Sequence, residues 1–318
     1  MLVNQWIDVH AHFFPPESIE VREARRVSMT EAGRMVPEPP HWDPETTLDY
    51  MNRTGIAMQM LSNIPKDLQA LRYSNNYAAA LVQEHPARFG LLTALPTDCS
   101  DNALAEIARA SNELRTDGFA VTCHYNGVYL SDARLEPVWK ELDRRKAVVF
   151  AHPNAYAPAA MGRPAALVEV AFETARTVID MLYAGTFRKF PNIKFVLAHC
   201  GGALPALSGR LMILGNEKWI PNPNCVTPGE FRDHLRHLYL DTACTCPTAL
   251  GPALAMTTHD HLVYGSDCGV PCTTDATMQA NLEALLGYAG LTSEQIEGIG
   301  HNALRLFPAA AERIKKGK

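Results

Sequence analysis

Short apolar segments alternate with helical patterns along this chain of 318 residues, and this alternation restricts its fold more than any other feature. Strands that alternate with helices form a parallel sheet. Eight such repeats predict an α/β fold, a (β/α)8 TIM barrel, as one domain spanning residues 1–318. The expected strands are 5–9, 57–61, 89–94, 118–123, 147–151, 193–198, 237–240 and 262–264.

The intervening segments carry helical periodicity, with caps such as Asp101 before the apolar positions. A last helix, 293–315, is expected outside the barrel or against its bottom. Residues 13–42 form a long insertion after the first strand, and 153–164 form a second irregular loop. Because barrel enzymes place their chemistry in these loops, both are expected to border a pocket. The other expected helices are 43–53, 71–85, 101–115, 133–145, 164–187, 203–214, 228–236, 248–257 and 274–288.

Five polar residues stand where four apolar segments end or have just ended: His10, His12, His152, His199 and Asp267. Residues two apart in a strand point to the same face, so the two histidines of the first segment converge. Imidazoles with a carboxylate suit Zn²⁺ or a similar divalent ion. Buried core histidines are the alternative, but that alternative does not explain why all five share one end of the barrel. The pattern predicts a metal site.

Charge and cysteine content narrow the range of partners. The net charge of −5 is spread without long runs, which indicates neither a nucleic-acid nor a membrane partner. No leader-like segment precedes the first expected strand, and eight cysteines lack any C-x-x-C pair, so we expect reduced thiols and a cytoplasmic protein. Small molecules are the expected partners. Four of the cysteines follow the last two strands and are expected near the pocket: Cys244, Cys246, Cys268 and Cys272.

Several phrases along the chain are similar to those of one enzyme group. The chain resembles the amidohydrolase superfamily, in the branch that includes aminocarboxymuconate-semialdehyde, γ-resorcylate and 6-methylsalicylate decarboxylases. The phrases occur in order from one end to the other. They are DVHAHFFPP (8–16), WDPE (42–45), RFGLLTALP (88–96), FAHP (150–153), FPNIKFVLAHCGGALP (190–205), YLDTA (239–243), YGSD (264–267) and NALRLF (302–307).

The resemblance implies roles for particular residues. It makes His10, His12, His152 and Asp267 the ligands of one divalent metal ion per chain, Zn²⁺ or alternatively Mn²⁺, and His199 the catalytic histidine. The fourth strand ends without the lysine that holds a second metal in binuclear members. A homodimer or larger homo-oligomer is expected.

Further residues are expected to bind the substrate. Arg34 is the candidate for its carboxylate, unless it is a solvated surface residue. His124 and Asp241 are expected at the barrel mouth. The alternatives are a capping or tautomer-fixing role for His124, and backbone capping or positioning of His199 for Asp241.

The implied activity is non-oxidative decarboxylation of a small ortho-hydroxy aromatic (salicylate-like) or muconate-type carboxylic acid. The carbon that loses CO₂ must gain a proton, either from Asp267 or after addition of water with His199 as base. The sequence does not choose between these routes. A hydrolase, lactonase or hydratase acting on a ring-cleavage product is the alternative enzyme. A barrel that binds a ligand without catalysis is the third hypothesis.

Overall fold

The computed structural model describes residues 3, 5–31, 35–154 and 162–317. Within them, eight parallel strands form one sheet in the order β1-β2-β3-β4-β7-β8-β9-β10. These strands are the eight expected ones, with ends that move by three residues at most. Their bounds are β1 Ile7–His12, β2 Met58–Ser62, β3 Phe89–Ala94, β4 Gly118–Thr122, β7 Val148–His152, β8 Lys194–Leu197, β9 Tyr239–Asp241 and β10 Leu262–Val263.

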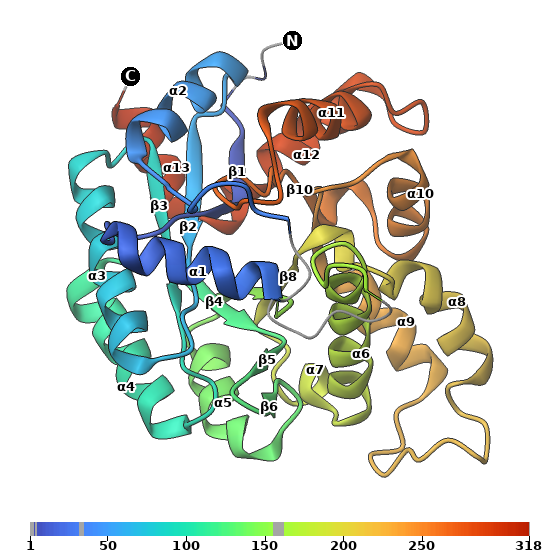
Figure 1. Cartoon of the computed structure of the whole chain (residues 1–318). Helices are drawn as coiled ribbons and strands as arrows, with labels where there is room; N and C mark the ends of the chain where they lie inside the picture. The colour runs from blue at the N-terminus through green and yellow to red at the C-terminus, as the bar shows by residue number, and fades with distance from the viewer. Residues whose placement is uncertain (1–2, 4, 32–34, 155–161, 318) are drawn as a thin grey trace.

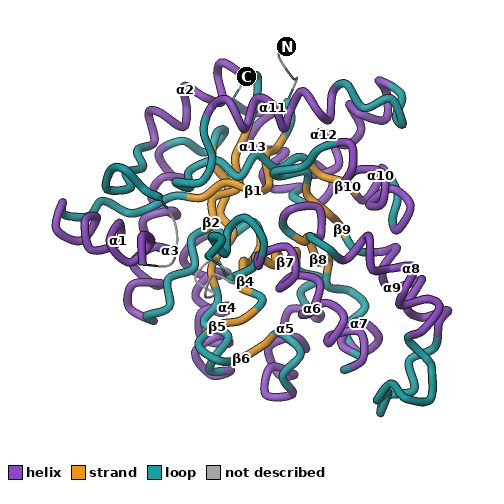
Figure 2. Tube along the Cα trace, turned by 45° about the vertical axis from the view of Figure 1, so that its right-hand side comes forward, coloured by secondary structure: helices purple, strands orange, loops and turns teal. Residues whose placement is uncertain are grey.

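The sheet closes on itself where the last strand meets the first. Val9 N donates to Tyr264 O at 2.9 Å, and Asp267 N donates to His10 O at 2.9 Å. One residue further, His12 N donates to Cys268 O at 2.7 Å. The segment after β10 thus continues along β1, and the predicted TIM barrel is confirmed. Figure 2 shows the strands gathered at the centre with helices around them.

Apolar side chains fill the inside of the barrel, and the C-terminal helices close its bottom. Leu306, Phe307 and Ile314 pack in one cluster with lumen residues such as Val9 and Phe150. The prediction of one helix over 293–315 was wrong in its continuity, because α12 (Ser293–Leu306) ends before α13 (Pro308–Lys316) begins. A proline has no N–H to continue a helix but is well suited to start one.

Most of the other expected helices are present. Three of them are shorter than expected and are joined to a second helical turn. In the expected helix 164–187, Gly185 with φ +72° separates α6 from α7. The helices are α2 Pro44–Thr54, α3 Leu68–Glu84, α4 Ser100–Arg109 followed by a π turn Ala110–Leu114, α5 Glu136–Arg144 preceded by a 3₁₀ turn Ala133–Leu135, α6 Glu169–Tyr183, α7 Thr186–Lys189, α8 Leu204–Leu214, α9 Pro228–His237, α10 Pro247–Met256 and α11 Asp275–Leu286.

The first insertion contains a helix that the sequence patterns did not predict. Helix α1, Ile19–Glu31, crosses in front of β2 and β4 in Figure 1. Among its side chains only Met29 is buried, so its apolar periodicity is weak. A small hairpin, β5 (His124–Tyr125) with β6 (Val128–Tyr129), follows β4. None of the helices in the described part of the chain is both long and apolar enough to span a membrane.

Candidate metal centre and active site

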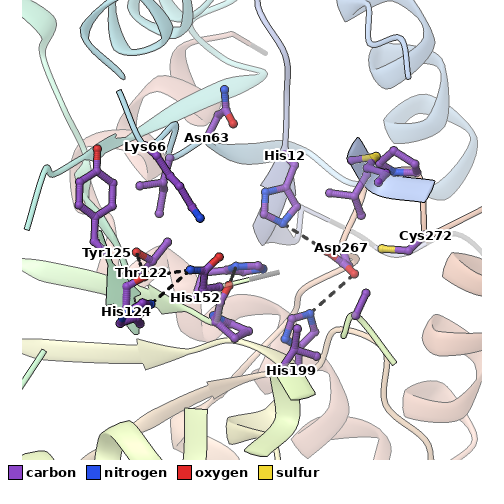
Figure 3. A pocket seen from close by; sticks show the side chains of 18 of the residues that line it. His12, Asn63, Lys66, Thr122, His124, Tyr125, His152, His199, Asp267 and Cys272 are labelled. Carbon is purple, nitrogen blue, oxygen red and sulfur yellow. Dashed lines mark hydrogen bonds and ion pairs between the residues drawn. The ribbon is translucent and has the colours of Figure 1, made fainter. Parts of the chain in front are cut away.

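Five polar side chains converge at the C-terminal end of the barrel. His10 and His12 lie on β1, His152 ends β7, His199 follows β8 and Asp267 follows β10. The backbone at His199 (φ +54°) and Asp267 (φ +60°) is left-handed, a conformation that is costly for residues other than glycine. The fold holds both residues in this conformation as the chain leaves the strand. Figure 3 shows the side chains of His12, His199 and Asp267 facing one another at one side of a pocket.

The candidate ligand atoms are close enough to share one ion. His10 Nε2 lies 3.0 Å from His12 Nε2. Asp267 Oδ1 lies 3.1 Å from His10 Nε2 and 3.3 Å from His12 Nε2. Ligand atoms of His10, His152, His199 and Asp267 all lie within 4.8 Å of one another. The structure therefore brings together all four proposed ligands and the proposed catalytic histidine.

The protonation of these rings indicates what can fill the space between them. His10 Nδ1 lies 2.7 Å from Asp241 Oδ2, and His152 Nδ1 lies 2.7 Å from the Pro153 carbonyl oxygen. Both partners are acceptors, so Nδ1 of each ring carries a proton, and Nε2 is the atom left to bind a cation. His152 Nε2 is buried and has no hydrogen-bond partner among the described residues. Lone pairs and a carboxylate that face one another are satisfied by a cation, so this donor set fits a divalent metal.

The charges around the cluster also favour a cation between these side chains. Burial lowers the pKa of His10, but the Asp241 and Asp267 carboxylates outweigh it and raise that pKa to about 10. Without a metal ion the Nε2 atom of His10 therefore holds a proton, which a bound ion would displace. Burial, together with neighbouring histidines, holds the pKa of His152 well below its ordinary range. Burial alone would raise the pKa of Asp267, yet His10, His12 and His199 hold it well below its ordinary range. His152 is thus neutral and Asp267 ionised, the forms that bind metals.

Asp241 corrects one expectation from the sequence. Its side chain is fully buried, so it does not face a substrate at the barrel mouth. Its Oδ2 accepts from the His10 ring at 2.7 Å, while its Oδ1 accepts from Cys200 N at 3.3 Å and Ala243 N at 2.9 Å. This carboxylate therefore orients the His10 ring and also caps two backbone N–H groups, the capping role being one of the alternatives left open by the sequence.

Two further groups brace the cluster. Asp8 accepts hydrogen bonds from His10 N at 3.1 Å and Ser266 N at 3.0 Å, which ties β1 to the residue before Asp267. Burial raises the pKa of Asp8 to about 6. The Cys244 thiol donates to Asp267 Oδ2 at 3.3 Å. The surrounding protein and the Asp267 carboxylate raise the pKa of this thiol, which stays protonated.

The pocket beside the cluster has polar and apolar sides. Apolar lining residues include Phe14 and Met29 from the first insertion, and its polar lining includes Asn63, Lys66 and His124. Figure 3 shows Lys66 and His124 on the side of the pocket opposite Asp267. His124 lies at the pocket as expected, although it belongs to the β5 hairpin rather than to the end of β4. Arg34 lies outside the described residues.

Sequence reasoning missed three pocket residues. Asn63 follows β2 directly, Lys66 lies in the same loop, and Asn154 is the second residue after β7. The rule that found the histidines, a polar residue after an apolar segment, would also have found these. Asn154 contributes its amide to the hairpin, because its Nδ2 donates to His124 O at 3.3 Å.

Comparison with known proteins places the chain. Residues 7–309 match the amidohydrolase family. The chain belongs to this family. It is 32% identical to the decarboxylase macB of Penicillium terrestre, over 95% of this chain and 94% of the relative. It is 30% identical to the 6-methylsalicylic acid decarboxylase acuB of Aspergillus aculeatus, over 98% of this chain and 97% of the relative.

The fold is also that of a solved relative. A dihydroxybenzoic acid decarboxylase from Polaromonas, crystallised with bound manganese and the inhibitor 2-nitroresorcinol, superposes with a TM-score of 0.76. The alignment covers 96% of this chain and 97% of the other, at 21% identity, and therefore shows a shared fold. The family and its decarboxylase branch, expected from the sequence phrases, are confirmed by these relatives.

Proposed function

We propose that this protein is a metal-dependent, non-oxidative decarboxylase of a small ortho-hydroxy aromatic acid. The observation that carries the proposal is the convergence of imidazole lone pairs and one carboxylate, including the buried His152 Nε2 without a hydrogen-bond partner among the described residues. Relatives that are decarboxylases and align over nearly the whole chain support the reaction type.

His10, His12, His152 and Asp267 would hold the ion, with Zn²⁺ as the first candidate and Mn²⁺ as the second. When bound, a divalent ion supplies a positive centre that can chelate a carboxylate and a neighbouring hydroxyl oxygen and stabilise charge that develops on the ring. Asp241 and the Pro153 carbonyl fix the His10 and His152 rings through Nδ1, so these side chains are oriented before any ligand arrives.

The residues that move a proton are proposed to be His199 and Asp267. His199 Nε2 lies 3.7 Å from Asp267 Oδ2 at the edge of the pocket. His199 Nδ1 is buried without a hydrogen-bond partner among the described residues, so its ring lacks the anchor that the rings of His10 and His152 have. A ring that is not fixed through its second nitrogen suits proton transfer better than it suits metal binding.

The walls of the pocket suit a small aromatic anion. Phe14, Ile64 and Val170 offer apolar surface for a ring and its substituents. Lys66 supplies the only fixed positive charge among the described lining residues, and its amine points into the pocket in Figure 3. An ammonium group opposite the metal ligands would attract an anionic substrate and orient its ring.

The test is a screen for CO₂ release with Zn²⁺-loaded and Mn²⁺-loaded enzyme. Ortho-hydroxy benzoic acids, alkyl-substituted and unsubstituted, are compared with muconate-type acids and with lactones of similar size. We expect CO₂ from at least one ortho-hydroxy acid. Hydrolysis of the lactones without CO₂ release from any acid would overturn the proposal in favour of a hydrolase. A homodimer or larger homo-oligomer and a cytoplasmic location stay predictions, and light scattering after size-exclusion chromatography tests the assembly.

A further inference from the structure

The carboxylate of Asp267 is contacted by the protein on both of its oxygens. Oδ1 faces His10 and His12, at 3.1 and 3.3 Å. Oδ2 accepts the Cys244 thiol at 3.3 Å and lies 3.7 Å from His199 Nε2. Cys244 comes from a different part of the barrel, the loop between β9 and α10. Its sulfur therefore contacts Oδ2, the oxygen near His199, and not Oδ1, which faces His10 and His12.

The backbone conformation at Cys244 is one that glycine adopts more easily than cysteine. Its φ is +53°, in the left-handed region where glycine is favoured and other residues are strained. Core packing does not offset this strain, because Cys244 is exposed as a residue and lies outside the core. Its sulfur is nevertheless partly buried beside the cluster, where it donates a hydrogen bond to Asp267. Strain held beside a reactive group is typical of residues that serve the site.

We propose that Cys244 is a positioning residue whose thiol fixes the rotation of the Asp267 carboxylate. With Oδ2 held, Oδ1 stays directed at the proposed metal position, and Oδ2 stays within reach of His199 for proton transfer. Only the part about proton transfer between Oδ2 and His199 rests on the proposed function. The orientation of Oδ1 toward a metal ion holds whatever reaction the ion serves.

The experiment compares Cys244→Ala, Cys244→Ser and Cys244→Gly with the wild-type protein. The first readout is the dissociation constant of Zn²⁺ and Mn²⁺, measured by competition with a chromophoric chelator in the absence of substrate. Losing a group that orients a ligand weakens metal binding roughly 10–100-fold, and a thiol is a weak donor, so we expect about 10-fold for Ala and Gly. Serine keeps a donor and should bind the metal within about 3-fold of wild type.

The Cys244→Gly variant separates a loss of metal affinity from a loss of stability. Cys244→Gly relieves the left-handed backbone, so it should melt at or above the temperature of Cys244→Ala while binding metal equally weakly. Lys146→Gly is the matched control, because Lys146 also has a positive φ, +52°, but lies just before β7 at the far end of the barrel. This control should gain stability and keep wild-type metal affinity.

With an active substrate in hand, kcat should fall in the Ala and Gly variants while KM changes little, and serine should restore most of kcat. Wild-type metal affinity in Cys244→Ala and Cys244→Gly would overturn the proposal, as would a serine variant as weak as alanine. Because metal affinity is measured without substrate, failure of the decarboxylase assay leaves this test decisive.

Discussion

At His10 and His152 the Nδ1 atom is bound by a protein acceptor, whereas at His199 the same atom has no partner among the described residues. This difference supports the roles proposed for His10, His152 and His199. A ligand atom of His199 lies within 4.8 Å of those of His10, His152 and Asp267, so distance alone does not separate it from the proposed ligands. Histidines that bind a metal usually donate their other ring N–H to a protein acceptor, as His10 and His152 do.

Removing a proposed ligand should remove the metal. His10→Ala and Asp267→Ala each delete one donor from the cluster, and we expect both proteins to lose most of the roughly one divalent ion per chain. Elemental analysis after gel filtration measures the metal content. His301→Ala, on α12 and away from the cluster, is the control and should keep its ion. Full occupancy in the two ligand variants would show that the metal site lies elsewhere.

Removing His199 should separate metal binding from turnover. His199→Ala is expected to retain most of its metal while kcat falls on the order of 10²–10⁴-fold, the range for a general acid or base. Elemental analysis and steady-state CO₂ release are measured on the same preparation. Loss of metal with normal activity per bound ion would instead make His199 a ligand.

At the scale of helices and strands, the elements with a clear apolar pattern were predicted and those without one were missed. All eight strands were found because each is a short apolar segment with polar flanks. Helix α1 was missed because it buries only Met29, and the α12–α13 boundary was missed because the apolar pattern continues past Pro308. Asp241 was placed on the correct strand, but its partner His10 was not predicted, because β9 and β1 are not paired and come together only through the closure of the barrel across β10.

The contact between α6 and the loop after β7 gives a prediction about pH and stability. Glu173 on α6 accepts a hydrogen bond from Asn154 N at 3.0 Å. Burial raises the pKa of Glu173 from its ordinary value of 4.5 to about 7. A carboxyl group whose pKa is raised on folding stabilises the protein below its unfolded pKa, and this stabilisation is lost as pH rises through the folded pKa.

Glu173→Gln keeps an acceptor for Asn154 N but cannot ionise. Between pH 5.5 and pH 8 the wild-type free energy of unfolding should therefore fall relative to that of the variant by about 2 kcal/mol. Urea denaturation at the two pH values measures the difference. Glu283→Gln, an exposed acid on α11, is the control and should follow the wild type. Parallel pH dependence in wild type and Glu173→Gln would show that Glu173 ionises normally.

At the scale of the whole molecule, the barrel brings together groups from both ends of the chain. His10 lies on the first strand and Asp267 after the last, yet their ligand atoms are 3.1 Å apart because the sheet closes between β10 and β1. The closed sheet also separates two regions. Below the cluster the lumen is filled by apolar side chains and closed by α13, and above it lies the pocket, whose lining includes residues of the first insertion and of the loop after β2. Among the described residues, the cluster therefore faces a pocket on one side only.

Because the cluster faces the pocket on one side, the positions of a substrate's oxygen atoms decide whether they can reach one metal ion together. A ring that enters from the pocket can present a carboxylate and an ortho hydroxyl oxygen to one ion as a single chelate, whereas a meta hydroxyl cannot reach it. The meta-hydroxy isomer of any turned-over ortho-hydroxy acid should release no CO₂ above background.

In D₂O the product should carry one deuterium at the carbon that lost CO₂, because the incoming proton comes from an exchangeable group such as Asp267 or His199. Mass spectrometry of the product measures this incorporation. Equal turnover of the ortho and meta isomers, or a product without deuterium, would contradict chelation and proton delivery from the cluster.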